Sequence, residues 1–331
     1  MIGPARLHAG ADVQGRYGLE ALDTMIGYNL AGAVTSETSS VSIDDAHRIA
    51  TGLFAEIDMQ VVRPLRLSGG IRVDAVRNTN TGGFFGDRTV THAAPAGVFA
   101  ATLTPADRLT VTAQVARGFR DPILSNRFYR GPVGRGFIEG NPDLGPETSL
   151  QFDLAGRYRV GALRLAAAAY HYRINDLVER YAATATSFFF RNRGRAHLRG
   201  FELEAQATMP RGFTVAATAE TSLGRDAADG TPLDDVAPAS VSIALRHGLG
   251  DRLASYARFS MVGTHDFAGP SEVSTERYQL LDAGVVWRLS RHLELRGALR
   301  NLLDEVYQSS AGPRWVWAPG RQVSLTKAAS F

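Results

Sequence analysis

Apolar and polar residues alternate along much of this chain with a period of two. Between residues 65 and 76, apolar or small residues at odd positions alternate with mostly polar residues at even positions. Residues 281–289 and 293–300 repeat the pattern, with charged side chains on one face only. Because successive side chains of a β-strand point to opposite faces, this alternation predicts strands with one apolar face and one polar face.

The alternation predicts about fourteen strands, joined by seven long loops and six tight turns. An even number of strands places both chain ends on the side of the tight turns. A polar stretch rich in Ser and Thr, which extends to about Asp45, is predicted to be a connection and not a strand. The predicted strands cover residues 6–13, 47–62, 65–76, 90–103, 109–116, 149–160, 163–175, 197–208, 212–223, 241–247, 252–262, 280–289, 293–303 and 320–331.

The length of the strands separates two classes of β-protein. A solvated antiparallel sheet also alternates, so alternation alone does not decide between a soluble β-sandwich and a membrane barrel. Globular strands usually have about 5–6 residues, whereas a tilted strand crossing a bilayer needs roughly 9–11, with short turns on one side and long loops on the other. Several predicted strands reach that length, and no apolar run is long enough for a transmembrane helix. The sequence therefore predicts an all-β, antiparallel transmembrane β-barrel, with a soluble β-sandwich binding module as the less favoured alternative.

One long connection, of about two dozen residues, lies between the strands that end near Ala116 and begin near Ser149. Structureless connections of this length are uncommon unless they bind or gate something. Pro122, Pro142 and Pro146 stiffen its ends, which predicts a preset shape. Arg120 and Glu147 stand where the chain leaves and re-enters the sheet, so we expect them to lie side by side and to form an ion pair that holds the loop.

Four ordered motifs between Phe119 and Tyr307 resemble those of the outer-membrane TonB-dependent receptors. Phe119-Arg120-Asp121-Pro122 resembles the family's Phe-Arg-Ala-Pro signature, with Asp121 in place of Ala, and Gly140 to Glu147 matches its Gly-Asn-Pro-x-Leu-x-Pro-Glu loop. Arg199 to Glu204 and Arg300 to Tyr307 resemble two later motifs, and the chain ends in Phe331. Most of these residues are expected only to shape turns. The motif residues are Phe119, Arg120, Pro122, Gly140, Asn141, Pro142, Leu144, Pro146, Glu147, Gly200, Glu202, Asn301, Leu302, Asp304, Tyr307 and Phe331.

The resemblance implies a receptor in the outer membrane of a Gram-negative bacterium and not an enzyme. Its partners would be outer-membrane lipid and a scarce small-molecule ligand, in the first place a ferric siderophore or other metal chelate. Family barrels have roughly 22 strands around a plug domain, so residues 1–331 are expected to be the C-terminal part of the barrel without a plug. Coupling to the TonB complex would then require a plug that this chain lacks. The alternative function is a self-contained 14-stranded passive channel or a truncated remnant without transport.

Two groups of loop residues combine positive charge with aromatic surface. They suit an anionic, partly aromatic ligand such as a ferric siderophore, because arginine binds both carboxylates and aromatic faces. The competing interpretation is an aromatic girdle with solvated arginines. The candidate ligand-binding residues are Arg127, Tyr129, Arg130 and Arg135 in the long connection, and Phe188, Phe189, Phe190 and Arg191 in a later loop.

Composition and charge exclude several other functions. The net charge is only +3 and the arginines are spread along the chain, so no nucleic-acid surface is expected. The chain has no Cys, and its eight His show no metal-ligand spacing. No catalytic set, cofactor or metal is predicted. Four aspartates, Asp226, Asp229, Asp234 and Asp235, could gather Ca²⁺ through oxygen ligands, but a solvated loop explains them as well.

Overall fold

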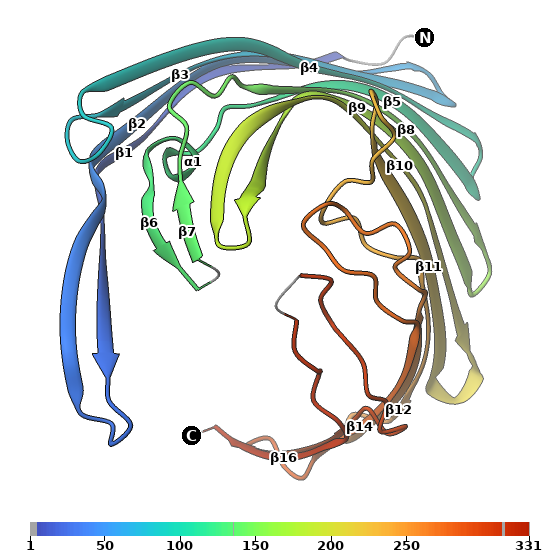
Figure 1. Cartoon of the computed structure of the whole chain (residues 1–331). Helices are drawn as coiled ribbons and strands as arrows, with labels where there is room; N and C mark the ends of the chain where they lie inside the picture. The colour runs from blue at the N-terminus through green and yellow to red at the C-terminus, as the bar shows by residue number, and fades with distance from the viewer. Residues whose placement is uncertain (1–4, 135, 313–314, 331) are drawn as a thin grey trace.

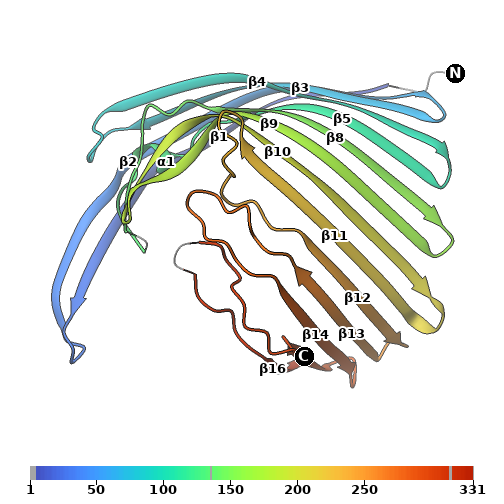
Figure 2. The same cartoon turned by 45° about the vertical axis from the view of Figure 1, so that its right-hand side comes forward.

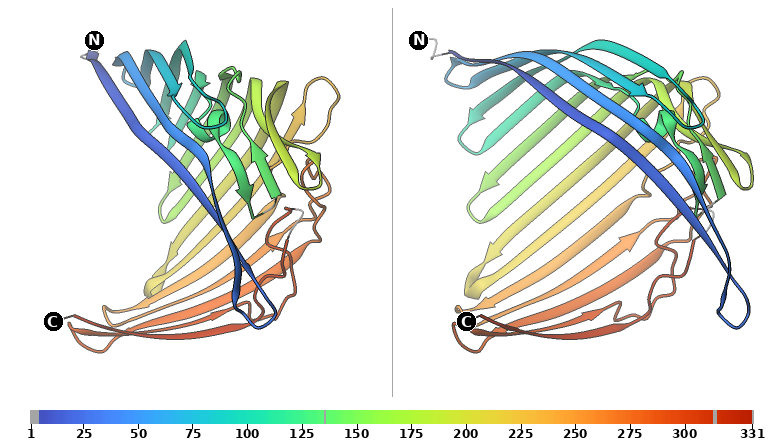
Figure 3. Two further views of the ribbon diagram at one scale, coloured as in Figure 1. Left: turned by 60° about the vertical axis from the view of Figure 1, so that its left-hand side comes forward. Right: turned by 90° about the vertical axis from the view of Figure 1, so that its left-hand side faces the viewer.

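The computed structural model describes residues 5–134, 136–312 and 315–330. Fourteen strands follow one another in an antiparallel sheet in sequence order, with β6 and β7 off this path. The sheet bends into an arc that surrounds an interior space (Figure 1). Within the described residues β1 pairs only with β2 and β16 only with β15, so the arc stays open between its two edges (Figure 3). The predicted fold class and strand number are confirmed, as an open part of a barrel.

The strands of the arc are longer than typical globular strands. They are β1 Ala5–Tyr28, β2 Val34–Val62, β3 Leu65–Asn80, β4 Arg88–Ala106, β5 Leu109–Arg120, β8 Glu147–Val160, β9 Leu163–Thr184, β10 Ser187–Met209, β11 Phe213–Asp226, β12 Ser240–Leu249, β13 Leu253–Val262, β14 Tyr278–Arg288, β15 Leu293–Arg300 and β16 Gln322–Ala329. The remaining elements are α1 Leu124–Phe128, β6 Arg130–Val133, β7 Gly136–Glu139 and the 3-10 turn Pro210–Gly212. No helix among the described residues is long and apolar enough to cross a membrane.

The register places apolar side chains on the convex face and polar side chains on the concave face. Phe259 lies opposite Leu281 on one face of β13 and β14, and Arg258 lies opposite Asp282 on the other. Large apolar side chains of the convex face remain highly exposed, for example Ile71 at 71% and Leu325 at 79%. Soluble monomers rarely expose contiguous apolar surface of this extent, so the convex face is built for a hydrocarbon environment.

The two rims of the arc differ in the length of their connections. On one rim, β-strands are joined by six tight turns, and the backbone has a positive φ in several of them, as at Gly161 and Gly250. Glycine adopts that conformation without the steric cost that other residues bear. On the other rim most connections are longer, and several of them reach into the interior of the arc, where α1, β6 and β7 also lie (Figure 1). Figure 2 shows the tight turns side by side at the ends of β8 to β11. The predicted division into tight turns and longer loops is confirmed.

Several strands extend beyond the predicted bounds on the long-loop rim. The polar stretch up to Asp45, predicted as a connection, forms the outer parts of β1 and β2 as one projecting ribbon. β9 and β10 likewise continue to Thr184 and from Ser187, where the prediction ended at residue 175 and resumed at 197. The prediction of those bounds was wrong because it relied on alternation, which a ribbon outside the bilayer does not need.

Candidate functional site

The long connection 121–146 folds as a compact unit against the concave face of the sheet. Its helix α1 buries Leu124 and Phe128 against Ile43 and Ala46 of β2. The chain then forms the short antiparallel hairpin β6–β7. The predicted preset shape is therefore present, although the connection contains a helix and two strands of its own. Four of the six largest fully buried side chains among the described residues belong to this unit, namely Pro122, Arg127, Phe128 and Leu144.

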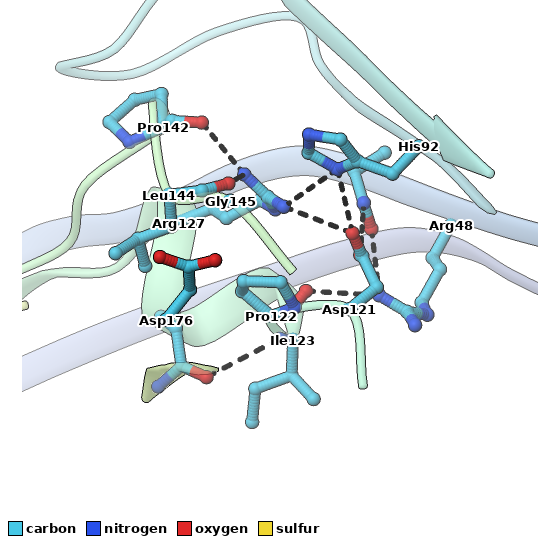
Figure 4. Close-up of polar contacts among 12 residues, drawn as sticks. Arg48, His92, Asp121, Pro122, Ile123, Arg127, Pro142, Leu144, Gly145 and Asp176 are labelled. Carbon is cyan, nitrogen blue, oxygen red and sulfur yellow. Dashed lines mark hydrogen bonds and ion pairs between the residues drawn. The ribbon is translucent and has the colours of Figure 1, made fainter. Parts of the chain in front are cut away.

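The carboxylate of Asp121 is the centre of a buried polar network (Figure 4). It accepts hydrogen bonds from Arg48 Nη1 at 2.8 Å, Asn78 Nδ2 at 2.7 Å and Arg127 Nη2 at 3.1 Å, and His92 Nδ1 lies 2.9 Å away. Arg48, Asn78 and His92 come from three strands of the sheet, whereas Asp121 and Arg127 belong to the connection. One carboxylate thus ties the start of the connection to the concave face.

Arg127 is an internal part of this unit and is not on its surface. Its side chain is fully buried, and Nη1 donates to the carbonyl oxygens of Pro142 at 2.8 Å and Leu144 at 2.7 Å. Burial lowers the pKa of the Arg127 guanidinium against the opposing effect of Asp121. Because a ligand on the surface has no access to a side chain in this position, we leave Arg127 out of the ligand-binding residues proposed below.

The expected ion pair at the neck of the connection is present. Arg120 lies opposite Glu147 in the register of β5 and β8, and its Nε donates to Glu147 Oε2. Glu147 is mostly buried, and its other oxygen accepts the backbone N–H of Val178 at 2.6 Å. The pair therefore connects the neck to the hairpin formed by β9 and β10.

Two loops that are distant in sequence join to form one small sheet inside the arc. β7 pairs in parallel with the start of β10, with Ile138 opposite Phe188. β10 also pairs with the end of β9, so that residues 130–133, 136–139 and 177–193 form a continuous surface, here named the loop sheet. Figure 1 shows its two parts side by side in the interior of the arc. The structure thus brings together the two groups of candidate residues that the sequence placed in separate loops.

Arginine side chains of the loop sheet lie over aromatic rings. Arg130 lies 4.0 Å from the centroid of the Phe84 ring and 5.1 Å from that of Phe137, and Arg191 lies 4.6 Å from the centroid of Tyr181. Each of the two also pairs with a carboxylate: Arg130 Nε is 3.0 Å from Glu139, and Arg191 Nη2 is 2.6 Å from Glu179. Their charges are therefore already compensated within the sheet.

Arg180 differs from these arginines in having no carboxylate partner among the described residues. It is exposed, and its guanidinium lies 5.3 Å from the centroid of the Phe188 ring. The sequence did not single out Arg180, Tyr181, Phe84 or Phe137. The only signal for Arg180 and Tyr181 would have been the pairing of β9 with the aromatic run Phe188 to Phe190, which requires the hairpin to be recognised first.

The remaining candidate residues have distinct surroundings. Tyr129 donates its hydroxyl to Asp23 at 3.0 Å and to the Pro132 carbonyl at 2.7 Å, and partial burial raises its pKa. Phe189 lies against the Tyr181 ring, with centroids 6.0 Å apart. Arg135 lies outside the described residues.

The motif residues mostly shape the backbone. A Cβ on Gly140 would lie 2.7 Å from the Arg127 backbone, so only glycine fits there. Asn301 has φ 49° and is almost fully buried, and its side chain caps the turn by accepting the Glu305 N–H at 2.9 Å. Tyr307 stacks on Tyr278 at 4.3 Å between ring centroids. The terminal Phe331 lies outside the described residues.

Three of the four aspartates considered for Ca²⁺ use their carboxylates in separate contacts, and the fourth, Asp235, donates its backbone N–H to Glu272 Oε1 at 3.0 Å. Asp226 pairs with Arg193 at 2.7 Å, and Asp229 accepts the Thr231 N–H, which lowers its pKa. Asp234 accepts the Ser271 N–H at 2.9 Å. Among the described residues no group of three or more His, Cys, Asp or Glu side chains is placed to hold a metal ion.

Comparisons with known proteins agree on the fold. The family model described as "TonB dependent receptor-like, beta-barrel" matches residues 4–302. An iron-regulated outer membrane virulence protein of Vibrio cholerae is 27% identical over 282 residues, covering 76% of this chain and 40% of that protein. The vitamin B12 transporter BtuB of Vibrio vulnificus is 25% identical over 228 residues, covering 66% of this chain and 34% of its own length.

Solved structures resemble the whole arc. The copper transporter OprC superposes with a TM-score of 0.82 at 19% identity, covering 99% of this chain and 54% of OprC. The ferric-catecholate import receptor Fiu from E. coli gives a TM-score of 0.72 at 17% identity, covering 100% of this chain and 52% of Fiu. This chain thus spans about half the length of these structures and less of the curated relatives.

Proposed function

The chain belongs to the family of TonB-dependent receptors, as part of their β-barrel, and from this premise we propose that it serves the uptake of a ferric siderophore or a similar anionic metal chelate that binds at the loop sheet. Barrels of this family lie in the outer membrane of Gram-negative bacteria and belong to transporters, not to enzymes. In such barrels the long loops face the outside of the cell, so the loop sheet is on the side from which a ligand arrives.

The observation that carries this proposal is the uncompensated charge of Arg180 above an aromatic ring. Arg130 and Arg191 already have carboxylate partners, whereas for Arg180 the described residues provide the Phe188 ring and no carboxylate. A guanidinium over an aromatic face offers an anion a charge and a planar surface at the same place. This combination suits a negatively charged metal chelate whose metal ion is surrounded by aromatic groups.

The names of the relatives do not select the ligand, because they include iron, copper and vitamin B12. The residues of this chain must therefore decide it. Around the loop sheet, arginine-over-aromatic contacts recur at Arg130, Arg180 and Arg191. We infer from this recurrence that the ligand is anionic and partly aromatic, and not a bare cation.

The test is a binding titration of the detergent-purified chain with a ferric tris-catecholate, with vitamin B12 as the uncharged comparison. We expect saturable binding of the catecholate that Arg180→Gln weakens by roughly tenfold. The matched control is Arg252→Gln, an exposed arginine in a tight turn on the opposite rim. Equal binding by wild type and Arg180→Gln, or tighter binding of vitamin B12, would contradict the proposal. Ion conductance in planar bilayers without saturable binding would favour the alternative of a passive channel.

A further inference from the structure

A second group of basic side chains lies on the other face of the sheet, which the proposed ligand does not reach. It is formed by neighbouring strands β9, β10 and β11 near the long-loop rim (Figure 2). We name it the basic rim patch. Its members are His171, Arg173, Arg195, His197, Arg199 and Arg225.

The register shows that these side chains share the convex face. On β9 and β10, His171 lies opposite Arg199 and Arg173 opposite His197, and His197 also lies opposite Arg225 on β11. The same face continues at Phe201, which is 45% exposed. Directly opposite residues of an antiparallel pair have Cβ atoms about 5 Å apart. The patch therefore packs up to six basic groups into an area of roughly 13 Å by 10 Å.

Nothing described on this face compensates the charge. No ion pair or side-chain hydrogen bond is formed by the guanidinium groups of Arg173, Arg195 and Arg199 within residues 5–134, 136–312 and 315–330. The positions of β8 to β11 that share the face hold no Asp or Glu. His197 Nδ1 is buried without a hydrogen-bond partner, and the His171 and His197 rings stack at 5.5 Å. Arg173 lies diagonally across from both Arg195 and Arg199, at about 7–8 Å by the usual spacing of such positions, so an anion bound among the three would offset their mutual repulsion.

The surface next to the patch is apolar and faces away from the interior of the arc. Towards the tight turns, the same face presents Phe201 and Leu203 of β10 and Leu154 of β8, each 43–55% exposed. Basic residues at the boundary between an apolar belt and water contact the headgroup layer of a bilayer. An anion bound there would be attached to hydrocarbon chains.

We propose that the basic rim patch binds the phosphate groups of a lipid in the outer leaflet, with the acyl chains of that lipid against the apolar convex face. Arginine donates two parallel hydrogen bonds to a phosphate, and three arginines on two strands provide such contacts for a headgroup with two phosphates. The lipid compensates the charge of the patch and holds this part of the barrel wall at a fixed depth. The site is separate from the loop sheet, so it does not depend on the identity of the transported ligand.

The test uses the full chain, produced in the outer membrane and purified in a zwitterionic detergent, with fluorescent diphosphoryl lipid A as the probe. We expect the triple variant Arg173→Gln, Arg195→Gln, Arg199→Gln to bind the probe about a hundredfold more weakly, since each arginine near a membrane surface contributes about fivefold. The matched control removes three arginines that line one cavity on the concave face, through Arg246→Gln, Arg258→Gln and Arg300→Gln, and should leave the affinity unchanged. Circular dichroism checks that both variants keep the sheet.

Two further probes distinguish the source of the phosphate. Dephosphorylated lipid A should bind wild type as weakly as the diphosphoryl form binds the triple variant. Inorganic pyrophosphate should compete only at concentrations far above those of the lipid. Equal affinity of wild type for both lipids, an unaffected triple variant, or competition by pyrophosphate at the same concentration as the lipid would each overturn the proposal.

Discussion

Replacing Asp121 by Asn should release the long connection from the concave face of the sheet. The Asp121 side chain is fully buried and serves two arginines, one of which, Arg127, is also fully buried. Asn keeps the shape of Asp but removes the charge, so Arg127 would remain buried without a counter-ion. Removing one partner of a buried ion pair costs about 3–5 kcal/mol. Because Arg127 still holds the carbonyls of Pro142 and Leu144, we expect this cost to appear as local opening and not as loss of the barrel wall.

Hydrogen exchange of the amides in residues 121–146 measures that opening. A cost of 3 kcal/mol or more corresponds to exchange at least a hundredfold faster in Asp121→Asn than in wild type, with the amides of β12 to β14 unchanged. The double variant Asp121→Asn, Arg127→Gln should recover part of the protection, because the fully buried charge of Arg127 is then no longer left without a counter-ion. Unchanged exchange in Asp121→Asn would refute the reasoning, as would a double variant that is less protected than the single one.

Three further predictions concern contacts between loops. Changing Glu147→Gln and Arg120→Gln singly and together should give non-additive losses of protease protection, whereas purely additive losses would show that the pair does not act as a unit. Burial raises the pKa of Glu272, but hydrogen bonds from the N–H groups of Gly269 and Asp235 and from His265 outweigh burial and bring the pKa below its ordinary value of 4.5. The loop 263–277 should therefore lose hydrogen-exchange protection as the pH falls through and below 4.5. Glu272→Gln should abolish this pH dependence. Gly136→Ala should separate β7 from β10, because the φ of Gly136 is 138° and a Cβ there would clash with the backbone carbonyl of Thr186. The control is Gly194→Ala, where a Cβ meets no atom within 4 Å. Equal rates of proteolysis of the two variants would contradict this prediction.

Sequence alternation predicted the strands only where the sheet has an apolar face. In β13 to β15 both faces are distinct along the whole strand, and the predicted bounds agree with the structure to within a few residues. In the outer part of β1 and β2 the backbone pairing continues, but neither face needs to be apolar in water, so the pattern disappears. Backbone hydrogen bonds between the strands hold such a ribbon together, and they do not require particular residue types.

The candidate site could be predicted only in part for a related reason. The prolines at the ends of the connection correctly indicated a preset shape, and the positions where the chain leaves and re-enters the sheet predicted the pair of Arg120 and Glu147. The sequence could not tell that Arg127 points into the unit and Arg130 out of it, since both are arginines in one short segment. That difference depends on the turn of α1 and on the register of β6 with β7, which are fixed by packing against the sheet.

The two rims of the arc differ in how far their connections can change in length without disturbing the sheet. Turn length determines the register between neighbouring strands, and the tight turns contain no spare residues. An insertion there would shift a strand and exchange its apolar and polar faces. On the opposite rim the sheet is already paired before the loops begin, so whole segments such as 121–146 can be lengthened, shortened or replaced while the wall stays in register. Evolution can therefore vary the loops of one rim extensively while the paired strands and the tight turns of the other rim stay the same.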